Sequence, residues 1–490
     1  MDEQEPQARD EARAEARLTA ARLSGEGVVA VALTWVDNAG IARVKGVPLR
    51  RLAEAAVEGI GMSPVFDVFL VDDAITTSRY LGGPDGDLRL FPALDRAVPL
   101  AAQPGWAFAP ADRFRQDGEP HAACQRHFAK SMAERAAARG ITFRAAFETE
   151  WIVQRAEDGS YPSQGPAYGL QRLTDLSDYL RDLLLALEAQ GLTVQQLHPE
   201  YAPGQFEVSV AATDPVAAAD DAVLVRATVR AVSAQHGLRA SFAPAFEPGG
   251  VGNGGHLHLS AWREGRNLLA DPGHAASGEP WRDVRAGEQG SAAGGSAHGV
   301  PAAAAGHRGA PQAVNPGDPD GEAFLAGVLA ELPALLALGA PGVASYLRLV
   351  PSRWAGAYQC WGVENREAAL RLIQGPDAAA NVEVKCFDQA ANPYLAVGGV
   401  IAAGLAGIDA KARLPEPVQG DPAQLPPSRQ PRRLPTDLDQ ALTAFRGSTV
   451  LRDALGDVLF EAVAAVRAAE QATLGGRSAE DVIAATRWRY

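Results

Sequence analysis

The sequence predicts an α+β protein in which a small β-rich unit precedes a larger unit of strands and helices. Residues 28–36 read Val-Val-Ala-Val-Ala-Leu-Thr-Trp-Val, a run typical of a buried strand. After Gly118 the pattern changes to helical periodicity, interrupted by further strand-like runs. We therefore expect a boundary near 115, with a tail over 1–24, a β unit over 25–115 and a larger unit over 116–490.

The composition limits the possible functions. Apolar residues make up 47% of the chain and charged residues 21%, as in ordinary globular proteins. Lys and Arg number 45 against 59 Asp and Glu, and this formal charge of −14 argues against nucleic-acid and membrane partners. The three cysteines, Cys124, Cys360 and Cys386, have no ligand-like spacing and fit a reducing cytoplasm.

The sequence predicts neither a secretory signal nor a membrane anchor. Acidic residues occupy positions 2, 3 and 5, where a secretory signal carries basic residues. The longest weakly polar run, residues 397–408, is too short for a membrane span, which needs roughly 20 residues. We expect a cytoplasmic protein.

The β unit contains alternating strand and turn signals. Residues 1–24 place Ala, Glu and Arg at helical spacing, which predicts a solvated helix before it. The strand over 28–36 is followed by a hairpin-like turn over 37–40 and a second strand over 41–47. Further β segments are expected through 86–92 and 106–114.

The larger unit mixes helices with strands. We expect a helix over 121–139, a strand over 142–153, and helices over 173–190 and 215–237 that pack on a sheet. Residues 271–318 are rich in Gly, Ala, Ser, His and Pro, which predicts a flexible insertion. We also expect a helix over 322–338, a strand over 381–387 and mostly helix over 435–490.

Two glutamates flank a predicted turn at 198–207, which reads His-Pro-Glu-Tyr-Ala-Pro-Gly-Gln-Phe-Glu. Proline fixes φ at the first central position of a turn, and glycine accepts a positive φ at the second. The chain can therefore reverse at Pro203-Gly204, so that Glu200 and Glu207 converge. Taken alone, the pair is more typical of solvated surface charges.

Three other segments place ionisable residues two apart: Glu148 and Glu150, His256 and His258, and Glu383 and Lys385. Side chains at i and i+2 of a strand lie on one face. The simplest interpretation of each segment is an amphipathic strand with a wet face. Five glutamates packed together beside the histidines are nevertheless costly without cations, which favours a Mg²⁺ or Mn²⁺ site.

A basic set accompanies these acids. Arg348, Arg366 and Arg371 carry guanidinium groups that bind carboxylates or phosphates, although exposed arginines paired with surface acids are an equal alternative. The glycine-rich residues 249–255 lack the lysine of a P-loop and predict close approach of the backbone to a ligand. Cations beside arginines suggest phosphoryl transfer.

At this point the sequence resembles the glutamine synthetase family. The matching segments are Phe-Glu-Thr-Glu at 147–150, Glu-Tyr-Ala-Pro-Gly-Gln-Phe-Glu at 200–207, Gly-Asn-Gly-Gly-His-Leu-His-Leu-Ser at 252–260, Asn365-Arg366 through Arg371, and Val-Glu-Val-Lys at 382–385. They occur in the order of the family and cover nearly the whole chain, except the N-terminal tail and the 271–318 insertion.

The resemblance implies a β-grasp N-terminal domain and a catalytic domain whose curved antiparallel sheet, flanked by helices, forms a funnel. It implies two or three cations, with one site formed by Glu150, Glu200 and Glu207 and another by Glu148, His256 and Glu383. ATP would phosphorylate the γ-carboxylate of glutamate, and an amine would then displace phosphate. The implied substrate, ATP and catalytic residues are Gly252, His258, Ser260, Arg348, Arg366, Arg371 and Lys385.

The family also forms stacked rings, so the resemblance implies a homo-oligomer. We favour a dodecamer over rings of five subunits. The N-terminal domain of a neighbouring subunit, around its equivalent of Asp73, would complete each site.

Three positions depart from the family pattern. Trp354 occupies the flap position at which ammonia-using members carry a glutamate, and an indole offers apolar and cation-π surface to an organic amine. Lys385 and Asn381 replace arginines that contact substrate and ATP. The sequence thus resembles the γ-glutamyl-amine ligase branch more than ammonia-using glutamine synthetase. The alternatives are a true glutamine synthetase whose base lies elsewhere, and a catalytically inactive structural relative.

Overall fold

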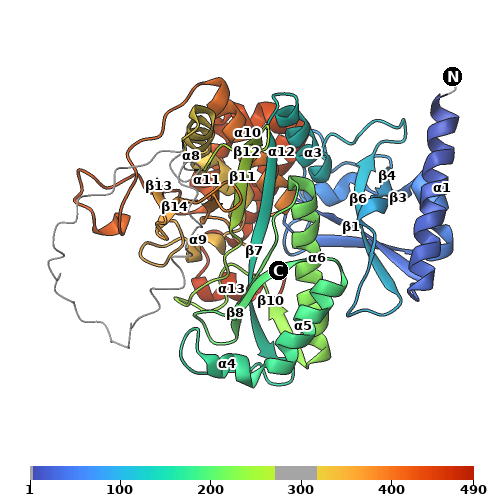
Figure 1. Cartoon of the computed structure of the whole chain (residues 1–490), viewed down its shortest axis with the longest axis horizontal. Helices are drawn as coiled ribbons and strands as arrows, with labels where there is room; N and C mark the ends of the chain where they lie inside the picture. The colour runs from blue at the N-terminus through green and yellow to red at the C-terminus, as the bar shows by residue number, and fades with distance from the viewer. Residues whose placement is uncertain (1–3, 271–316) are drawn as a thin grey trace.

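The computed structural model describes residues 4–270 and 317–490 as two sheets with their helices (Figure 1). The smaller sheet lies at one end of the molecule, with α1 (Gln4–Gly25) along its outer side. The larger body contains the long strand β7 near its centre. Nearly all of the expected 271–318 insertion lies outside the described residues.

The smaller sheet has the strand order β2-β1-β6-β4-β3, and β5 also pairs with β6. Strands β1 and β6 run parallel, and the other pairs are antiparallel. Its elements are β1 (Ala30–Val36), β2 (Ala42–Pro48), η1 (Leu49–Arg51), α2 (Leu52–Glu58), β3 (Ile60–Met62), η2 (Pro64–Val68), β4 (Leu88–Pro92), η3 (Leu94–Arg96), β5 (Val98–Pro99) and β6 (Trp106–Phe114).

The predicted N-terminal helix is present and is only partly solvated. Leu23 is fully buried in the core of the small sheet, whereas Leu18 is 74% exposed. The last strand of this sheet ends at Phe114 and the next helix begins at Gln125, so we propose that the domain boundary lies between them.

The larger sheet has the order β13-β14-β15-β11-β7-β9-β8, with β10 paired to β7 and β12 to β11. It is antiparallel apart from the parallel pair β13–β14, which the sequence did not predict. The strands are β7 (Thr142–Arg155), β8 (Val194–Pro199), β9 (Gln205–Val210), β10 (Leu238–Ser241), β11 (Leu257–Arg263), β12 (Arg266–Asn267), β13 (Tyr358–Val363), β14 (Ala368–Ile373) and β15 (Asn381–Val384).

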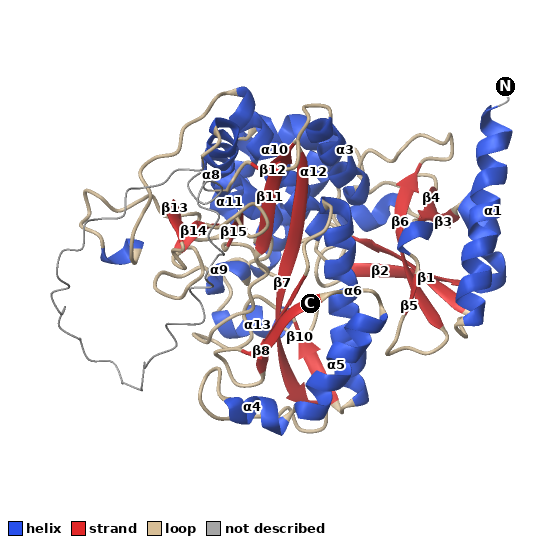
Figure 2. Cartoon of the chain, viewed as in Figure 1, coloured by secondary structure: helices blue, strands red, loops and turns tan. Residues whose placement is uncertain are grey.

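The helices of the larger body flank this sheet (Figure 2). They are α3 (Gln125–Ala137), α4 (Leu170–Asp175), α5 (Ser177–Ala189), α6 (Pro215–Gln235), α8 (Pro319–Gly339), α9 (Ser345–Arg348), α10 (Pro393–Asp409), η5 (Pro422–Gln424), α11 (Leu438–Gly447), α12 (Thr449–Leu474) and α13 (Ala479–Thr486). Helices α8, α10, α11 and α12 lie toward one end of the larger body, and α4 and α5 lie toward the other (Figure 2). The single helix expected over 173–190 is broken, because Leu176 between α4 and α5 adopts non-helical angles.

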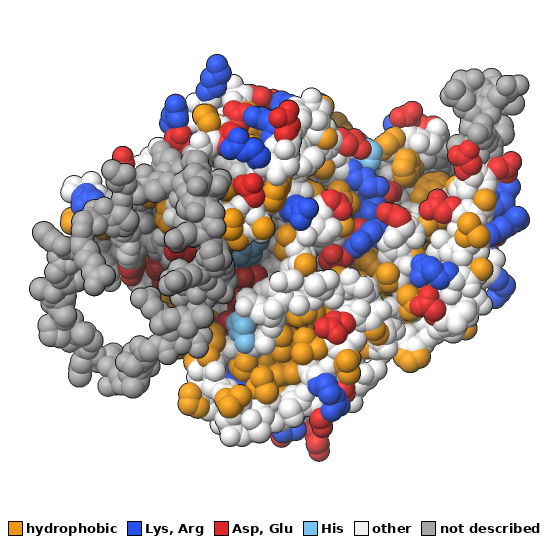
Figure 3. Space-filling view, viewed as in Figure 1, with side chains coloured by type: hydrophobic (Ala, Val, Ile, Leu, Met, Phe, Trp, Pro, Cys, Tyr) orange, Lys and Arg blue, Asp and Glu red, His pale blue; other side chains and the backbone are white. Residues whose placement is uncertain are grey.

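Helix α8 lies inside the larger body, whereas helices α4 and α5 expose apolar side chains at its surface. Helix α8 is apolar enough to span a membrane by composition, yet 83% of its apolar window is buried, as in a core helix. Where α4, α5 and β8 lie, hydrophobic side chains form a patch on the surface (Figure 3). Leu170, Leu173 and Leu185 are among the exposed residues of these helices.

A buried polar network joins the small domain to the larger body. Asp67 of η2 accepts a hydrogen bond of 2.6 Å from Arg113 and lies 2.8 Å from His121 Nε2. Gln125 at the start of α3 donates to Asn38 in the turn after β1, at 2.8 Å. Asp67 and Arg113 are each about 1% exposed, so their ion pair inside the small domain is shielded from water. Arg113 also donates to Gln125 at 2.6 Å, and the bonds of Gln125 and His121 hold the two units together.

Candidate active site

Strand β7 carries two of the acidic residues of the site near its centre. Glu148 and Glu150 point to one face, and the intervening Thr149 is buried on the other. Across the ladder, Glu150 pairs in register with Glu207 of β9. On the opposite edge of β7, the Glu148 amide donates to the carbonyl of His256 at 3.0 Å. One strand therefore aligns two neighbouring segments of the site.

The histidine segment leads into β11. His258 pairs in register with Glu383 of β15, and Leu257 between the two histidines is fully buried. A glycine at 255 allows this approach, because a Cβ there would lie 2.6 Å from the backbone carbon of Asp388. The alternation predicted from the spacing thus places both histidines on the acidic face.

The hairpin between β8 and β9 forms as predicted. Gly204 has φ +66°, and a side chain there would meet the Val153 carbonyl at 2.5 Å. The turn brings Glu200 and Glu207 to the same imidazole, since His198 lies 3.6 Å from Glu200 and 3.3 Å from Glu207.

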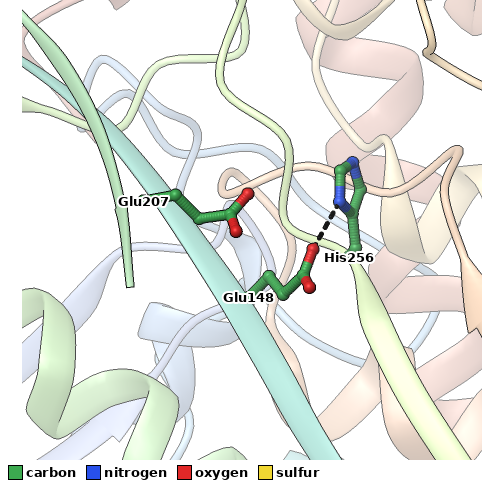
Figure 4. Close-up of side chains that lie close together, drawn as sticks. All are labelled: Glu148, Glu207 and His256. Atoms are coloured by element: carbon green, nitrogen blue, oxygen red, sulfur yellow. Dashed lines mark hydrogen bonds and ion pairs between the residues drawn. The ribbon is translucent and has the colours of Figure 1, made fainter. Parts of the chain in front are cut away.

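The acids and histidines meet in one cluster, part of which is shown in Figure 4. There, the carboxylates of Glu148 and Glu207 point toward the ring of His256, and Glu148 lies 3.0 Å from its Nδ1. Three groups have potential ligand atoms within 4.8 Å of one another: Glu148, Glu207 and His256; Glu148, His258 and Glu383; and His198, Glu200 and Glu207. This grouping overlaps the two expected cation sites without reproducing their division.

Charge repulsion and burial act on this cluster. Burial raises the pKa of Glu207 to about 8, and the neighbouring charge of Glu148 adds to the effect. Burial also raises the pKa of Glu150. At Glu148, burial opposes ionisation, but the charges of His258 and His256 outweigh it and lower the pKa. A bound cation would relieve the repulsion and allow all these carboxylates to ionise.

The donor set fits a hard divalent cation. Carboxylate oxygens dominate it, with one histidine in each group, as Mg²⁺ and more readily Mn²⁺ accept. In addition, the buried His258 Nε2 has no hydrogen-bond partner in the described part of the chain, although Glu148 Oε1 lies 3.1 Å away. Besides this contact with Glu148, the ring nitrogen faces the cluster in which the cations would be held.

Basic side chains border the cluster on the β14 and β15 side. Arg371 donates to Glu383 at 3.1 Å, and Lys385 donates to the other oxygen of Glu383 at 2.9 Å. Arg348, at the end of α9, lies 3.0 Å from His256 Nε2. All three are buried, so they balance the acids where water is scarce.

The remaining predicted residues differ in how near they lie to the cluster. The carbonyl of Gly252 accepts a 3.0 Å bond from Gln205, which also donates to Glu150 at 3.1 Å. Ser260 is buried on β11 and accepts from Trp262 at 2.8 Å. Trp354 is 51% exposed, and its ring centre lies 6.1 Å from that of Tyr201, next to Glu200.

Two predicted catalytic residues lie apart from the cluster. Arg366 is exposed in the turn between β13 and β14. Asp73 belongs to the small domain, where it contacts Arg43 at 2.8 Å and Arg489 at 2.9 Å. Within residues 4–270 and 317–490, neither contacts any of the six expected cation ligands. Asp73 has φ +69°, an uncommon conformation for aspartate.

The sequence prediction missed three residues at the site. His198 lies two positions before Glu200, so the same spacing rule could have found it. Tyr168 donates to Glu200 at 2.8 Å, and Gln205 donates to Glu150. These last two arise from tertiary contacts, and no local pattern marks them.

The fold and the site agree with comparisons to known proteins. The family model described as "Glutamine synthetase, catalytic domain" matches residues 122–319 and 313–482. A γ-glutamylpolyamine synthetase, GlnA3 of Streptomyces coelicolor, is 54% identical over 482 residues, covering 96% of this chain and 95% of the relative. The chain belongs to the glutamine synthetase family.

More distant relatives have the same fold. A glutamine synthetase of Halobacterium salinarum is 28% identical over 92% of this chain and 91% of its own length. The crystal structure of a glutamine synthase homologue superposes with a TM-score of 0.78 and 32% identity over 94% of this chain and 99% of that one. A GmaS–ADP complex gives 0.76 and 25% over 94% and 96%. The predictions of family and fold are confirmed, and the protein is an ATP-dependent carboxylate–amine ligase.

Proposed function

We propose that the protein joins the γ-carboxylate of glutamate to a primary amino group of a polyamine, with ATP as the energy source. The observation that carries this proposal is the 54% identity, over nearly the full length of both chains, to a γ-glutamylpolyamine synthetase. Trp354 supports it, since an exposed indole beside Tyr201 suits an organic cation better than ammonium.

In the proposed reaction, a γ-carboxylate oxygen of glutamate attacks the terminal phosphorus of ATP, and ADP leaves. The neutral amine then attacks the acyl carbon, phosphate leaves, and the nitrogen loses a proton. Two or three Mg²⁺ or Mn²⁺ ions, held by Glu148, Glu150, Glu200, Glu207, His256 and Glu383, would supply positive charge to the transferred phosphoryl group.

The side chains around the cluster have separate proposed roles. Arg348 would bind the glutamate carboxylate, and Arg371 with His258 would contact the phosphate side. Lys385 keeps a positive charge where the family resemblance implies an arginine, but it lacks the bidentate fork. Glu200, bound by Tyr168, stands beside the turn that approaches Trp354. It would orient the ammonium group of the amine substrate, which loses a proton before the neutral amine attacks.

The assembly and compartment follow the family pattern in our proposal. The exposed hydrophobic patch over α4, α5 and β8 supports association of subunits (Figure 3). We propose a homo-oligomer of stacked rings, a dodecamer, in which Asp73 acts across subunits and Arg366 serves the phosphate side of its own subunit. Cys124, Cys360 and Cys386 are all buried free thiols, which supports a reducing cytoplasm.

Product analysis with a panel of amines tests the proposal. The purified protein is incubated with ATP, Mg²⁺, glutamate and, separately, ammonium, butylamine, putrescine or spermidine, and the γ-glutamyl products are measured by mass spectrometry. We expect polyamines to give the highest kcat/KM. Higher activity with ammonium would indicate a glutamine synthetase, and no turnover with any amine in a folded oligomer would indicate an inactive relative.

The flap provides a second test. Trp354→Glu should lower kcat/KM for putrescine about five- to tenfold, because a cation-π contact worth ~1 kcal/mol is lost. Trp106→Glu, a change of an indole 41% exposed in the small domain, is the matched control. Equal effects of the two changes would show that Trp354 does not contact the amine.

A further inference from the structure

A cavity of about 220 Å³ opens beside the site and is unused by the proposed chemistry. Its walls come from three segments. They are Tyr201, Ala202 and Pro203 of the hairpin turn; Phe246, Glu247, Gly249, Gly250 and Val251 at the start of the glycine-rich loop; and Arg353 of the flap. Ile152 and Tyr161 complete the lining. We call this cavity the tail pocket.

Each wall of the tail pocket continues directly into the site. Tyr201 follows Glu200, and Arg353 precedes Trp354. Ile152 stands at i+4 from Glu148 on β7, so it belongs to the same strand face as the two acids. Since consecutive Cα atoms are only about 3.8 Å apart, the pocket lies within a few ångströms of the amine end of the site.

The glycine-rich loop presents one carboxylate to this pocket. Residues 247–250 form a turn, closed by a 3.1 Å bond from the Gly250 amide to the Glu247 carbonyl, with Gly249 at φ +69°. Proline and glycine at the central positions are what a type II turn requires. Glu247 is thus held at the first corner of a rigid turn and is exposed.

The Glu247 carboxylate is oriented by a phenol, while Arg353 lines the same pocket and Arg487 lies near enough for its charge to act on Tyr161. Tyr161 Oη donates to Glu247 Oε1, and among the described residues no cation lies within ion-pair distance of Glu247. Burial and the Glu247 charge both raise the pKa of Tyr161, so the phenol remains a donor at neutral pH. The second carboxylate oxygen is left to accept a bond from a ligand.

We propose that the tail pocket binds the far end of the amine substrate, with Glu247 receiving a second ammonium group. Phe246, Ile152 and Pro203 line the route with apolar surface that suits the methylene spacer between two nitrogens. The aromatic faces of Tyr201 and Tyr161 suit a cation. This inference rests on the proposed function and deepens it, because it assigns the pocket and the carboxylate that bind the second ammonium group of the polyamine.

Arg353 allows a second substitution for which the opposite effect on diamine use is expected. Its guanidinium group is exposed and donates to the Gly249 carbonyl at 3.4 Å, so it places a positive charge at the mouth of the tail pocket. That charge repels a second ammonium group, while Glu247 attracts it. Neutralising the two residues should therefore have opposite effects on diamine use.

The experiment measures the ratio of kcat/KM for putrescine to that for butylamine, which has the same carbon chain but one nitrogen. Glu247→Gln should lower this ratio about five- to tenfold, the effect of losing one charge-assisted contact at an exposed site. Arg353→Gln should raise it. Glu188→Gln, an exposed glutamate on α5, is the matched control and should leave the ratio unchanged.

The outcomes separate the tail pocket from the proposed function. An unchanged ratio in Glu247→Gln, with a wild-type enzyme that prefers putrescine, would overturn the tail pocket and leave the polyamine ligase intact. A wild-type enzyme that uses ammonium alone would overturn both. Equal thermal midpoints of the three variants and the wild type would exclude misfolding as the cause of a changed ratio.

Discussion

Replacing Glu148 with glutamine should remove more bound cation than the same change at Glu200 of the hairpin. Glu148 belongs to two of the three candidate groups, with His256 and Glu207 in one and with His258 and Glu383 in the other. Glu200 belongs to one group only. Glutamine keeps the shape of the side chain but lacks the negative charge that a hard cation requires.

The expected magnitude follows from counting sites. At a free Mn²⁺ concentration 100 times its Kd, each bound cation stabilises the folded protein by about 2.7 kcal/mol. Glu148→Gln should therefore lose up to about 5 kcal/mol of Mn²⁺-dependent stabilisation, and Glu200→Gln about half of that. If instead each carboxylate serves a single cation, as the family resemblance implies, the two losses will be equal.

Calorimetry distinguishes these cases. The protein is stripped of metal with EDTA, Mn²⁺ is titrated to obtain the stoichiometry, and the thermal midpoint is measured with and without Mn²⁺. Using the metal-dependent shift cancels any effect of the substitution on the metal-free fold. Equal losses, or a larger loss in Glu200→Gln, would refute the assignment of Glu148 to two cations.

Two further outcomes concern glutamate binding and stability. Arg348→Lys should raise KM for glutamate at least about tenfold with a smaller change in kcat, since lysine cannot form the two parallel hydrogen bonds of a guanidinium group. Initial rates at saturating ATP and putrescine test this. A rise confined to the KM for the amine would contradict it. Asp67→Asn should destabilise the protein by about 3–5 kcal/mol at pH 7, because the buried Arg113 loses its partner. Burial opposes ionisation of Asp67, but Arg113 and His121 lower its pKa below 3.8 in the folded protein. The stabilisation from the ionised Asp67 is therefore complete above pH 3.8 and is lost as the pH falls through the lower pKa of the folded state. Thermal midpoints across pH, with the exposed Asp95→Asn as control, measure it, and a difference that grows on acidification would be the wrong sign.

Much of the site could be predicted because strands and turns have simple periodicities. The i, i+2 spacing of Glu148 and Glu150 and the glycine of the hairpin locate side chains without knowledge of the fold. The buried Thr149 and Leu257 show that the alternation holds in β7 and β11. The family resemblance then supplied the reaction.

Other features depend on contacts that a linear pattern does not encode. The pairing of β13 with β14 is parallel despite their short connection, and the break at Leu176 divides a helix that periodicity would continue. Tyr168 reaches Glu200 from a segment 32 residues earlier. The tail pocket combines three loops, and only the fold brings their residues together.

Strand β7 also fixes the distance between two parts of the active site. Glu148 at the cation cluster and Ile152 at the tail pocket are four residues apart on one continuous strand, a separation of about 13 Å at the usual rise per residue. Because β9, β10 and β11 all bond to this strand, the interval cannot stretch without breaking several ladders. Strand β7 would thus fix the distance from the cation cluster to the apolar wall at Ile152, whereas the loop that carries Glu247 sets where the second ammonium group is held.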